Sequence, residues 1–279
     1  MENIAKPRKK NVLLSNKTFF ENQTLLINEG LQNCVDREVY PVEYIKQTTI
    51  SDLKTSSGIK EYLAQQKQTK VIGIMGRGSI KRHSPQYKDA AFIGKKLAEE
   101  GYLILTGGGG GAMEAVHLGV WFAGRKDREL INALALLASE SDSKPPKYYL
   151  PAKLIKKRYP RVMETANLSI LTFIYGTTHA NHFASAYATY FNNAIREETL
   201  ITSAKDGVIF LPGGYGTLLE LFIALEYNSD EIRTRANRPL ILYNSKFWKR
   251  TLGPDLLKKI RLTDNIEDIV QWLSTTNSR

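Results

Sequence analysis

The sequence predicts an α/β fold in which a mostly parallel, doubly wound sheet is covered by helices on both faces. Short continuous apolar runs alternate along the chain with segments of helical periodicity, which is typical of parallel strands buried on both sides. Glycine-rich turns follow two of these runs directly. Ligands of such folds bind at the carboxyl ends of the strands, so the turns also indicate where a site lies.

The regular pattern begins near Lys70. Strands are expected at Val71–Met75, Tyr102–Thr106, Leu168–Ile174, Val208–Leu211 and Pro239–Tyr243. Helices are expected at Ser84–Glu100, Ala112–Ala123, Glu129–Ser139, Ala180–Ala204, from Thr217 onward and at Ile266–Leu273. Pro85 suits a first helical turn and Gly101 suits the end of that helix. We therefore expect a main domain over residues 67–279. An N-terminal extension, residues 1–66, precedes it, with helical pieces near Phe19–Leu31 and Ile59–Gln66.

The bulk composition indicates a globular protein. The 279 residues are 42% hydrophobic and 24% charged, which allows one large core. No apolar run approaches the roughly 20 residues that cross a bilayer, and the basic N-terminus lacks a signal-peptide pattern, so we expect no membrane partner. Cys34 is the only cysteine. It excludes an intramolecular disulfide and favours a reducing, cytoplasmic location.

The sharpest motif is VIFLPGGYGTLLELF, Val208 to Phe222. A strand-like run ends at Pro212, glycines follow, and a helical pattern starts near Thr217. Backbone N–H groups and the positive end of a helix dipole then point at one spot, which suits a phosphate. The expected phosphate contacts are Gly213, Gly214, Gly216 and Thr217. Glu220 lies one turn into the helix and is available for other chemistry.

A pentaglycine turn stands about a hundred residues earlier, in YLILTGGGGGAMEAV. Five consecutive glycines lose much conformational entropy on folding, which favours close approach of a ligand over a flexible hairpin or linker. A third strand-to-turn junction, Gly76-Arg77-Gly78-Ser79, follows the first strand. The candidate nucleotide contacts from these two turns are Gly76, Arg77, Ser79, Gly107, Gly108, Gly109, Gly110, Gly111, Met113 and Glu114.

Two other ligand chemistries receive little support. Gly107, Gly109 and Ala112 satisfy G-x-G-x-x-A, but this turn follows the second strand of the unit, and Asp127 lies in a polar stretch instead of at a strand end. A dinucleotide site is therefore disfavoured. His179 and His182 are three residues apart, but no cysteine or carboxylate cluster completes a metal site, so no metal is expected.

The net charge of +11 is concentrated in one segment, Lys144–Arg161, which holds seven basic residues and no acid among three tyrosines. Three interpretations stay open for this basic segment. It forms a solvated loop, a lid over a phosphorylated substrate, or a nucleic-acid contact in which tyrosines stack on bases.

The two glycine motifs together resemble a known family. PGGYGTLLE resembles the P-G-G-x-G-T-x-x-E signature of the Lonely Guy (LOG) family, also called lysine decarboxylase-like, and TGGGGGAMEAVHLG resembles a second segment of the same superfamily. The resemblance covers roughly Val71 to Tyr243. It implies a Rossmann-like fold, hydrolysis of a nucleoside 5′-monophosphate to free base and ribose 5-phosphate, no cofactor, and a homodimer.

The resemblance also assigns residues. Gly213, Gly214, Gly216 and Thr217 match the phosphate loop and Glu220 matches the catalytic glutamate. Arg196, about one helix upstream, matches the catalytic arginine. Leu219 replaces a second glutamate that many members carry, and the spacing from Arg196 to Pro212 is one residue longer than typical, which indicates a divergent branch. No lysine follows either motif in the way that pyridoxal phosphate would require.

Alternatives remain for each of these residues. Arg196 stands beside Glu197 and Glu198 as a surface charge would, and Glu220 suits a helix N-terminus electrostatically. Glu114 either meets ribose hydroxyls or caps its helix. For the whole chain, the alternatives to a hydrolase are a non-catalytic nucleotide sensor or carrier and a basic nucleic-acid-binding protein.

Overall fold

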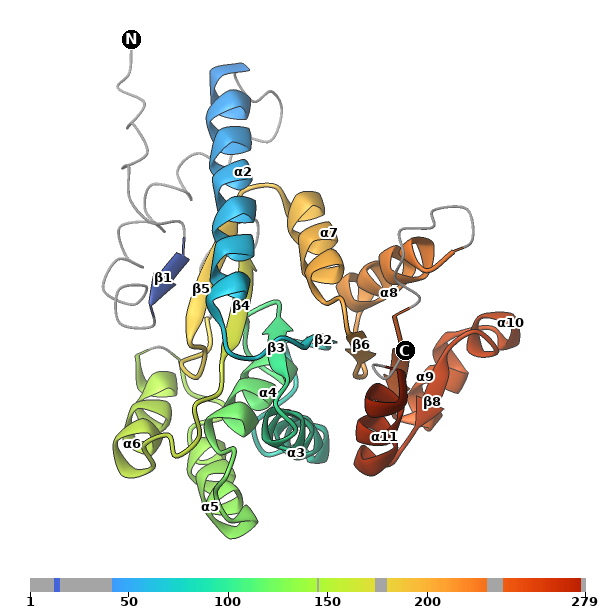
Figure 1. Cartoon of the computed structure of the whole chain (residues 1–279). Helices are drawn as coiled ribbons and strands as arrows, with labels where there is room; N and C mark the ends of the chain where they lie inside the picture. Colours follow the sequence, from blue (N-terminus) through green and yellow to red (C-terminus); the bar gives the residue numbers. More distant parts are fainter. Residues whose placement is uncertain (1–12, 16–41, 145, 174–179, 230–237, 277–279) are drawn as a thin grey trace.

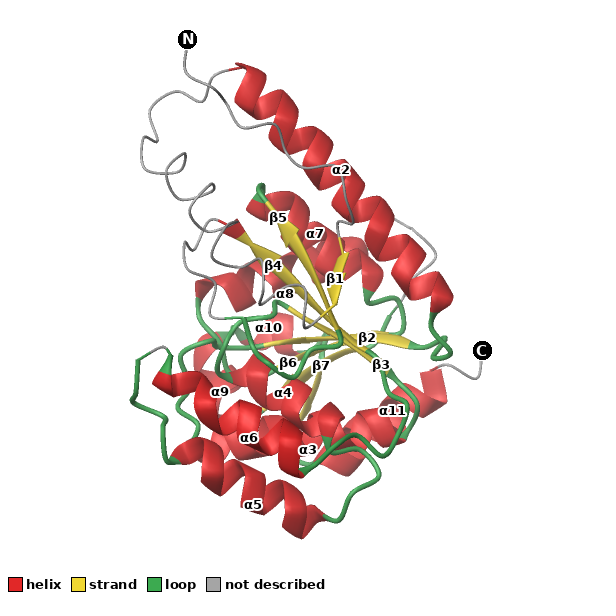
Figure 2. Ribbon diagram, turned by 90° about the vertical axis from the view of Figure 1, so that its left-hand side faces the viewer, coloured by secondary structure: helices red, strands yellow, loops and turns green. Residues whose placement is uncertain are grey.

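The computed structural model of the chain describes residues 13–15, 42–144, 146–173, 180–229 and 238–276. Its centre is an eight-stranded sheet with the order β1-β5-β4-β3-β2-β6-β7-β8 (Figures 1 and 2). The strands are β1 (Leu13–Ser15), β2 (Val71–Met75), β3 (Leu103–Thr106), β4 (Asn167–Thr172), β5 (Ala186–Tyr190), β6 (Gly207–Phe210), β7 (Leu240–Tyr243) and β8 (Arg261–Thr263). Strands β2 to β8 run parallel, and β1 pairs antiparallel with β5 at the edge.

Helices cover both faces of the sheet (Figure 2). Those that line the two faces or join the strands are α2 (Val42–Gln65), α3 (Pro85–Glu99), α4 (Ala112–Trp121), α5 (Asp127–Ala138), α6 (Leu150–Arg158), α7 (Asn193–Ser203), α8 (Tyr215–Tyr227), α9 (Ser245–Thr251), α10 (Pro254–Leu257) and α11 (Ile266–Thr276), with a 3₁₀ turn, η1 (Lys147–Tyr149), before α6. The predicted Rossmann-like, doubly wound, mostly parallel architecture is confirmed.

Each central strand sends alternate side chains into two separate cores. Ile72, Ile104 and Ile209 pack with α3, α4 and α11 on one face. Leu103, Val208 and Phe210 pack with α2, α7, α8 and α9 on the other face. Because side chains of a strand alternate between its faces, strands buried on both sides must be apolar at every position. This explains the continuous apolar runs of the sequence.

One predicted element is wrong. The expected long helix over Ala180–Ala204 is divided into strand β5 and helix α7, which begins after Asn192. The Asn192 side chain accepts hydrogen bonds from the backbone N–H groups of Ala194 and Ile195, and so caps α7. The alanines suggested a helix, but the Tyr187 and Tyr190 side chains are fully buried beside β4, and packing in the sheet outweighs helix propensity.

The N-terminal extension is not separated from the main domain by a break in packing. Helix α2 begins at Val42, earlier than the expected Ile59, and its Ile59 lies in the core with α7 and α8. Asp52 of α2 accepts hydrogen bonds of 2.8 and 2.9 Å from the backbone N–H groups of Phe191 and Asn192. The other helical piece expected in the extension, Phe19–Leu31, lies outside the described residues, and so does Cys34.

The strand order places a switch point between β2 and β6. From β2 the chain proceeds outward through β3, β4 and β5, and then returns to place β6 on the opposite side of β2. The connections on either side of a switch point diverge above and below the sheet, which leaves a crevice at the carboxyl ends of the strands. Strands β2, β3 and β6 end there in the three glycine-rich turns.

Candidate active site

Backbone hydrogen bonds join the three turns at the switch point. The Arg77 N–H donates to the Pro212 carbonyl at 3.2 Å, and the Arg77 carbonyl accepts from the Ala112 N–H at 3.1 Å. The turn after β2 is thus attached to both of the others. A Cβ at Gly213 would lie 2.1 Å from Oγ1 of Thr217, so the PGGYGT turn can close onto its helix only with glycine there.

A cavity of about 410 Å³ opens between these turns. Eleven of the residues singled out from the sequence line it: Gly76, Arg77, Gly107, Gly109, Gly110, Met113, Arg196, Gly214, Gly216, Thr217 and Glu220. Four more lining residues, Met75, Gly78, Leu171 and Thr172, were not predicted. Together they surround the cavity with backbone amides, two guanidinium groups, one carboxylate and an apolar surface.

Five of the expected contacts, Glu114 among them, do not line the cavity. Gly108, Gly111 and Gly213 are buried, and Ser79 is exposed, but none of them is a lining residue. Part of the glycine content serves packing, because the Met113 side chain lies between the turns. A Cβ at Gly107 would be 3.0 Å from the Met113 Sδ, and one at Gly109 would be 3.0 Å from its Cε.

Arg196 is a buried residue of the cavity, with 5% of its surface exposed. Its Nε donates to Oδ1 of Asn193 at 3.0 Å and its Nη1 to the Ile170 carbonyl at 3.4 Å. Its Nη2 lies 3.2 Å from Oε1 of Glu197, which is itself 1% exposed. The alternative interpretation of Arg196 as a surface charge is therefore wrong.

Glu220 completes an ion pair with this arginine. Its Oε1 lies 3.6 Å from Nη2 of Arg196, and the residue is 7% exposed. Burial raises the pKa of Glu220 to about 7, with the Arg196 charge opposing the shift and the Glu197 charge adding to it. A carboxyl group with a pKa near neutrality, in a cavity, beside an arginine, has the properties expected of a group that acts in catalysis.

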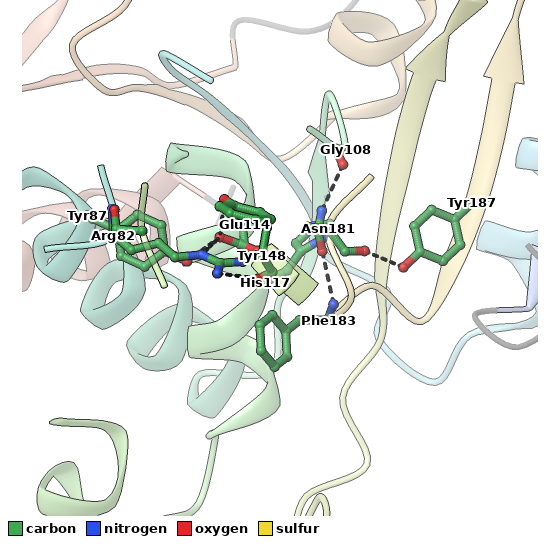
Figure 3. A network of polar contacts seen from close by, with 10 residues as sticks. Arg82, Tyr87, Gly108, Glu114, His117, Tyr148, Asn181, Phe183 and Tyr187 are labelled. Atoms are coloured by element: carbon green, nitrogen blue, oxygen red, sulfur yellow. Dashed lines mark hydrogen bonds and ion pairs between the residues drawn. The ribbon is translucent and has the colours of Figure 1, made fainter. Parts of the chain in front are cut away.

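Glu114 does not line the cavity, and its surroundings give no support to a ribose contact. Its carboxylate forms a bidentate pair with Arg82, with Nη2–Oε1 at 2.6 Å and Nε–Oε2 at 2.9 Å (Figure 3). It also accepts from the Tyr87 hydroxyl at 2.7 Å and from the Tyr148 hydroxyl at 3.3 Å. All these partners compensate the cost of burying the charge, so Glu114 has a structural environment.

The basic segment is largely ordered into η1 and α6. Pro151, Ala152 and Ile155 bury one side of α6, whereas Lys153, Lys157 and Arg158 are exposed. The guanidinium of Arg82 lies 3.5 Å from the centre of the Tyr148 ring. Within the described part of the segment, no residue lines the cavity. A lid is therefore not formed in this structure, and Tyr148 is already occupied by a contact of its own.

The described residues contain no group of three or more His, Cys, Asp and Glu side chains that could hold a metal ion. His182 is buried, which together with the charge of Lys156 lowers its pKa to about 3, and His179 lies outside the described residues. In the same part of the chain, every helix is too short or too polar to cross a bilayer.

Comparisons with known proteins agree with the fold and the motifs. Residues 69–125 match the model of the SLOG cluster4 family, and residues 164–265 match the family described as Possible lysine decarboxylase. The two stretches together span more than half of the chain and contain all three glycine turns. No curated protein matches the sequence.

The solved structures that this chain matches include a molybdenum cofactor binding protein and a molybdenum cofactor carrier protein. The molybdenum cofactor binding protein of the phototrophic bacterium Rippkaea orientalis is 22% identical over 76% of this chain and 99% of its own, with a TM-score of 0.49. The molybdenum cofactor carrier protein of Chlamydomonas reinhardtii is 16% identical over 75% of this chain and 99% of its own, with a TM-score of 0.47.

The fold and the cavity at its switch point define a Rossmann-like α/β protein with a ligand-sized site between glycine turns. Both family matches fall on the stretches that carry the predicted motifs, so the predicted resemblance to the Lonely Guy, or lysine decarboxylase-like, proteins is confirmed.

Proposed function

We propose that the protein hydrolyses the N-glycosidic bond of a nucleoside 5′-monophosphate, giving a free base and ribose 5-phosphate. The observation that carries this proposal is the buried Arg196–Glu220 pair, 3.6 Å apart, in a cavity that the PGGYGT turn also lines. The turn offers backbone N–H groups and a helix N-terminus to the phosphate. Glu220, one helical turn further on, then lies within reach of the ribose.

The reaction breaks the bond between C1′ and the base nitrogen and joins a water oxygen to C1′, while a proton from water ends on the base. Positive charge develops on the ribose in the transition state. The Glu220 carboxylate is placed to stabilise that charge or to orient the attacking water. Arg196 is placed to bind phosphate or ribose oxygens, or to assist the departing base.

The apolar part of the lining suits a base. Met75, Met113 and Leu171 border the cavity and can cover the faces of a planar ring. The residues that we assign to chemistry and to phosphate binding come from α7, α8 and the turn after β6, whereas Met75 and Met113 come from β2 and α4. A nucleotide would therefore extend from the PGGYGT turn toward the pentaglycine turn.

The test is incubation of the whole chain with a panel of nucleoside 5′-monophosphates, with separation of free base and ribose 5-phosphate by chromatography. We expect base release that survives EDTA, because the proposal uses no metal. A matched control is Glu226→Gln, which removes an exposed carboxylate from the same helix as Glu220. Binding of the nucleotides without base release would contradict hydrolysis and identify a nucleotide carrier or sensor.

A further inference from the structure

Buried polar groups next to the pentaglycine turn form a closed ring of hydrogen bonds that the proposed chemistry does not use. Figure 3 shows three of its members, His117, Asn181 and Gly108. His117 of α4 contacts Asn181 through Nδ1–Oδ1 at 3.3 Å and Thr106 through Nε2–Oγ1 at 3.3 Å. Asn181 Nδ2 donates to the Gly108 carbonyl at 3.0 Å, and the Gly108 N–H donates to Thr106 Oγ1 at 3.0 Å. His117, Asn181 and Thr106 are each no more than 1% exposed.

Each member of this ring donates a hydrogen bond to the next member, in one direction around the ring. Asn181 Oδ1 also accepts from the Phe183 N–H at 3.1 Å, so it is the acceptor for His117 and the histidine carries its proton on Nδ1. Nε2 is then an acceptor, and the Thr106 hydroxyl donates to it while accepting from Gly108. Hydrogen bonds arranged head to tail polarise one another, which strengthens the set.

The arrangement requires a neutral imidazole. Burial lowers the pKa of His117 to about 3, so the ring stays intact at neutral pH. With a proton on Nε2, the Thr106 hydroxyl would accept from both the imidazole N–H and the Gly108 N–H, and its own hydrogen would lose its acceptor in the ring. Each group in the ring thus has its partner, as groups buried this deeply require.

The ring holds a turn residue whose backbone conformation favours glycine. Gly108 has φ +78°, and a Cβ there would lie 2.7 Å from the Ser169 Cβ and 2.8 Å from Leu171 Cδ2. Its N–H and its carbonyl are both held by side chains of the ring, and the carbonyl accepts a second bond of 3.0 Å from the Asn181 N–H. Gly107 and Gly109, on either side, line the cavity.

We propose that His117 and Asn181 are positioning residues, which hold the pentaglycine turn, through Gly108, in the conformation that receives the nucleotide. The identity of the ligand in this proposal rests on the proposed function. The predicted effect of the ring on the conformation of the pentaglycine turn is independent of that function. The polar contacts of the Arg196–Glu220 pair are with Asn193, Ile170 and Glu197, and not with His117 or Asn181. The ring therefore governs binding and leaves the chemical step alone.

The test compares His117→Phe with the whole wild-type chain. The variant keeps a planar ring but breaks the bonds to Thr106 and Asn181. We expect hydrogen exchange of the peptide containing Gly107–Gly111 to become about tenfold faster, as loss of two hydrogen bonds implies. We expect the Kd for adenosine 5′-monophosphate, used as the probe, to rise about tenfold while kcat stays within about twofold of wild type.

Further variants separate this role from a general loss of stability. Thr106→Val removes only the hydroxyl and should reproduce both effects if His117→Phe does not fold. His117→Gln offers a donor and an acceptor. It should restore part of the protection of Gly107–Gly111 against hydrogen exchange. Ser169→Ala is the matched control, since Ser169 is buried in the same cluster, with contacts of 3.3 and 3.4 Å to Asn181 and His117, but lies outside the ring.

Wild-type exchange and affinity in folded His117→Phe or Thr106→Val would overturn the proposal, as would equal losses in Ser169→Ala. Failure of the wild-type protein to bind any nucleoside 5′-monophosphate of the panel would instead contradict the proposed function. The exchange measurement needs no ligand, so in that case it alone decides whether the ring holds the turn.

Discussion

Nη2 of Arg196 lies 3.6 Å from Oε1 of Glu220 and 3.2 Å from Oε1 of Glu197. One cation therefore stands between two buried carboxylates, which cannot both be neutralised by it. The carboxyl group with the more distant contact is Glu220, whose pKa is raised to about 7. Burial raises this pKa, and the shared arginine opposes the shift only in part, so Glu220 changes its charge near neutral pH.

We expect Glu220→Gln to fold and to bind nucleoside monophosphates, but to turn them over at least about a hundredfold more slowly, roughly 3 kcal/mol of barrier. Arg196→Ala should slow turnover as well and weaken binding, because both charge and bidentate contacts are lost. If the pair acts as a unit, the double variant should be little worse than the poorer single one. Steady-state kinetics and calorimetry give these quantities, and wild-type turnover by Glu220→Gln would remove the mechanism.

Activity should rise with pH through about 7. The Glu220 carboxylate is the form that stabilises positive charge, and its raised pKa means that this form gains population only as the pH passes that value. Glu197→Gln should move the midpoint of the kcat/KM profile to lower pH, because the Glu197 charge contributes to the raised pKa of Glu220. A profile with the same midpoint in both proteins would show that another group controls it.

Thr217→Val should weaken binding of a nucleoside monophosphate by roughly 1–2 kcal/mol, the scale of a lost hydrogen bond to a charged group. The residue is 5% exposed and lines the cavity at the start of α8, and valine preserves its branched shape. Calorimetry measures the change directly. An unchanged Kd would place the phosphate elsewhere in the cavity.

Changing Lys153, Lys157 and Arg158 together to serine should leave turnover unchanged, because these exposed side chains of α6 do not line the cavity. Turnover and salt-dependent binding of single-stranded DNA are both measured. A drop in turnover would support a lid that closes only with substrate. Loss of DNA binding at constant turnover would assign the segment to nucleic acid, and no change in either assay would leave a solvated face.

The expected homodimer suggests a role for the exposed face of α8. Tyr215, Leu219 and Phe222 are spaced at i, i+4 and i+7 and are 93%, 48% and 49% exposed. We propose that this face meets a second copy of the chain, and that Phe222→Glu shifts sedimentation from dimer to monomer. Ile131→Lys on α5, at a position 45% exposed, is the control and should not change it. A wild-type monomer at micromolar concentration would contradict the expectation.

The sequence predicted the central sheet well because each strand there faces two cores. The runs around Ile72, Ile104 and Ile209 are continuous and almost entirely apolar, and glycine-rich turns follow them, so both type and boundary were visible. Strand β5 was missed because its alanines and tyrosines suit a helix equally well until the neighbouring β4 is known. The three residues of β8 are too few to show a period.

The sequence identifies site residues that belong to a motif. It does not reveal the surroundings of residues whose partners are distant along the chain. Arg196 and Glu220 were found through their motif, and both line the cavity. Glu114 was misjudged because its partners Arg82 and Tyr148 are 32 and 34 residues away along the chain. Glu197 received no role from the sequence, and only the packing of α7 against the sheet shows that it is buried.

The switch point between β2 and β6 makes the cavity a joint property of two parts of the chain. The segment matched at residues 69–125 supplies the turns after β2 and β3, and the segment matched at residues 164–265 supplies Arg196, Glu220 and the PGGYGT turn. A nucleotide in the cavity would contact both segments and would stabilise their association without a covalent bond. Saturating ligand should then delay their separation on heating, with a shift in Tm that grows with ligand concentration.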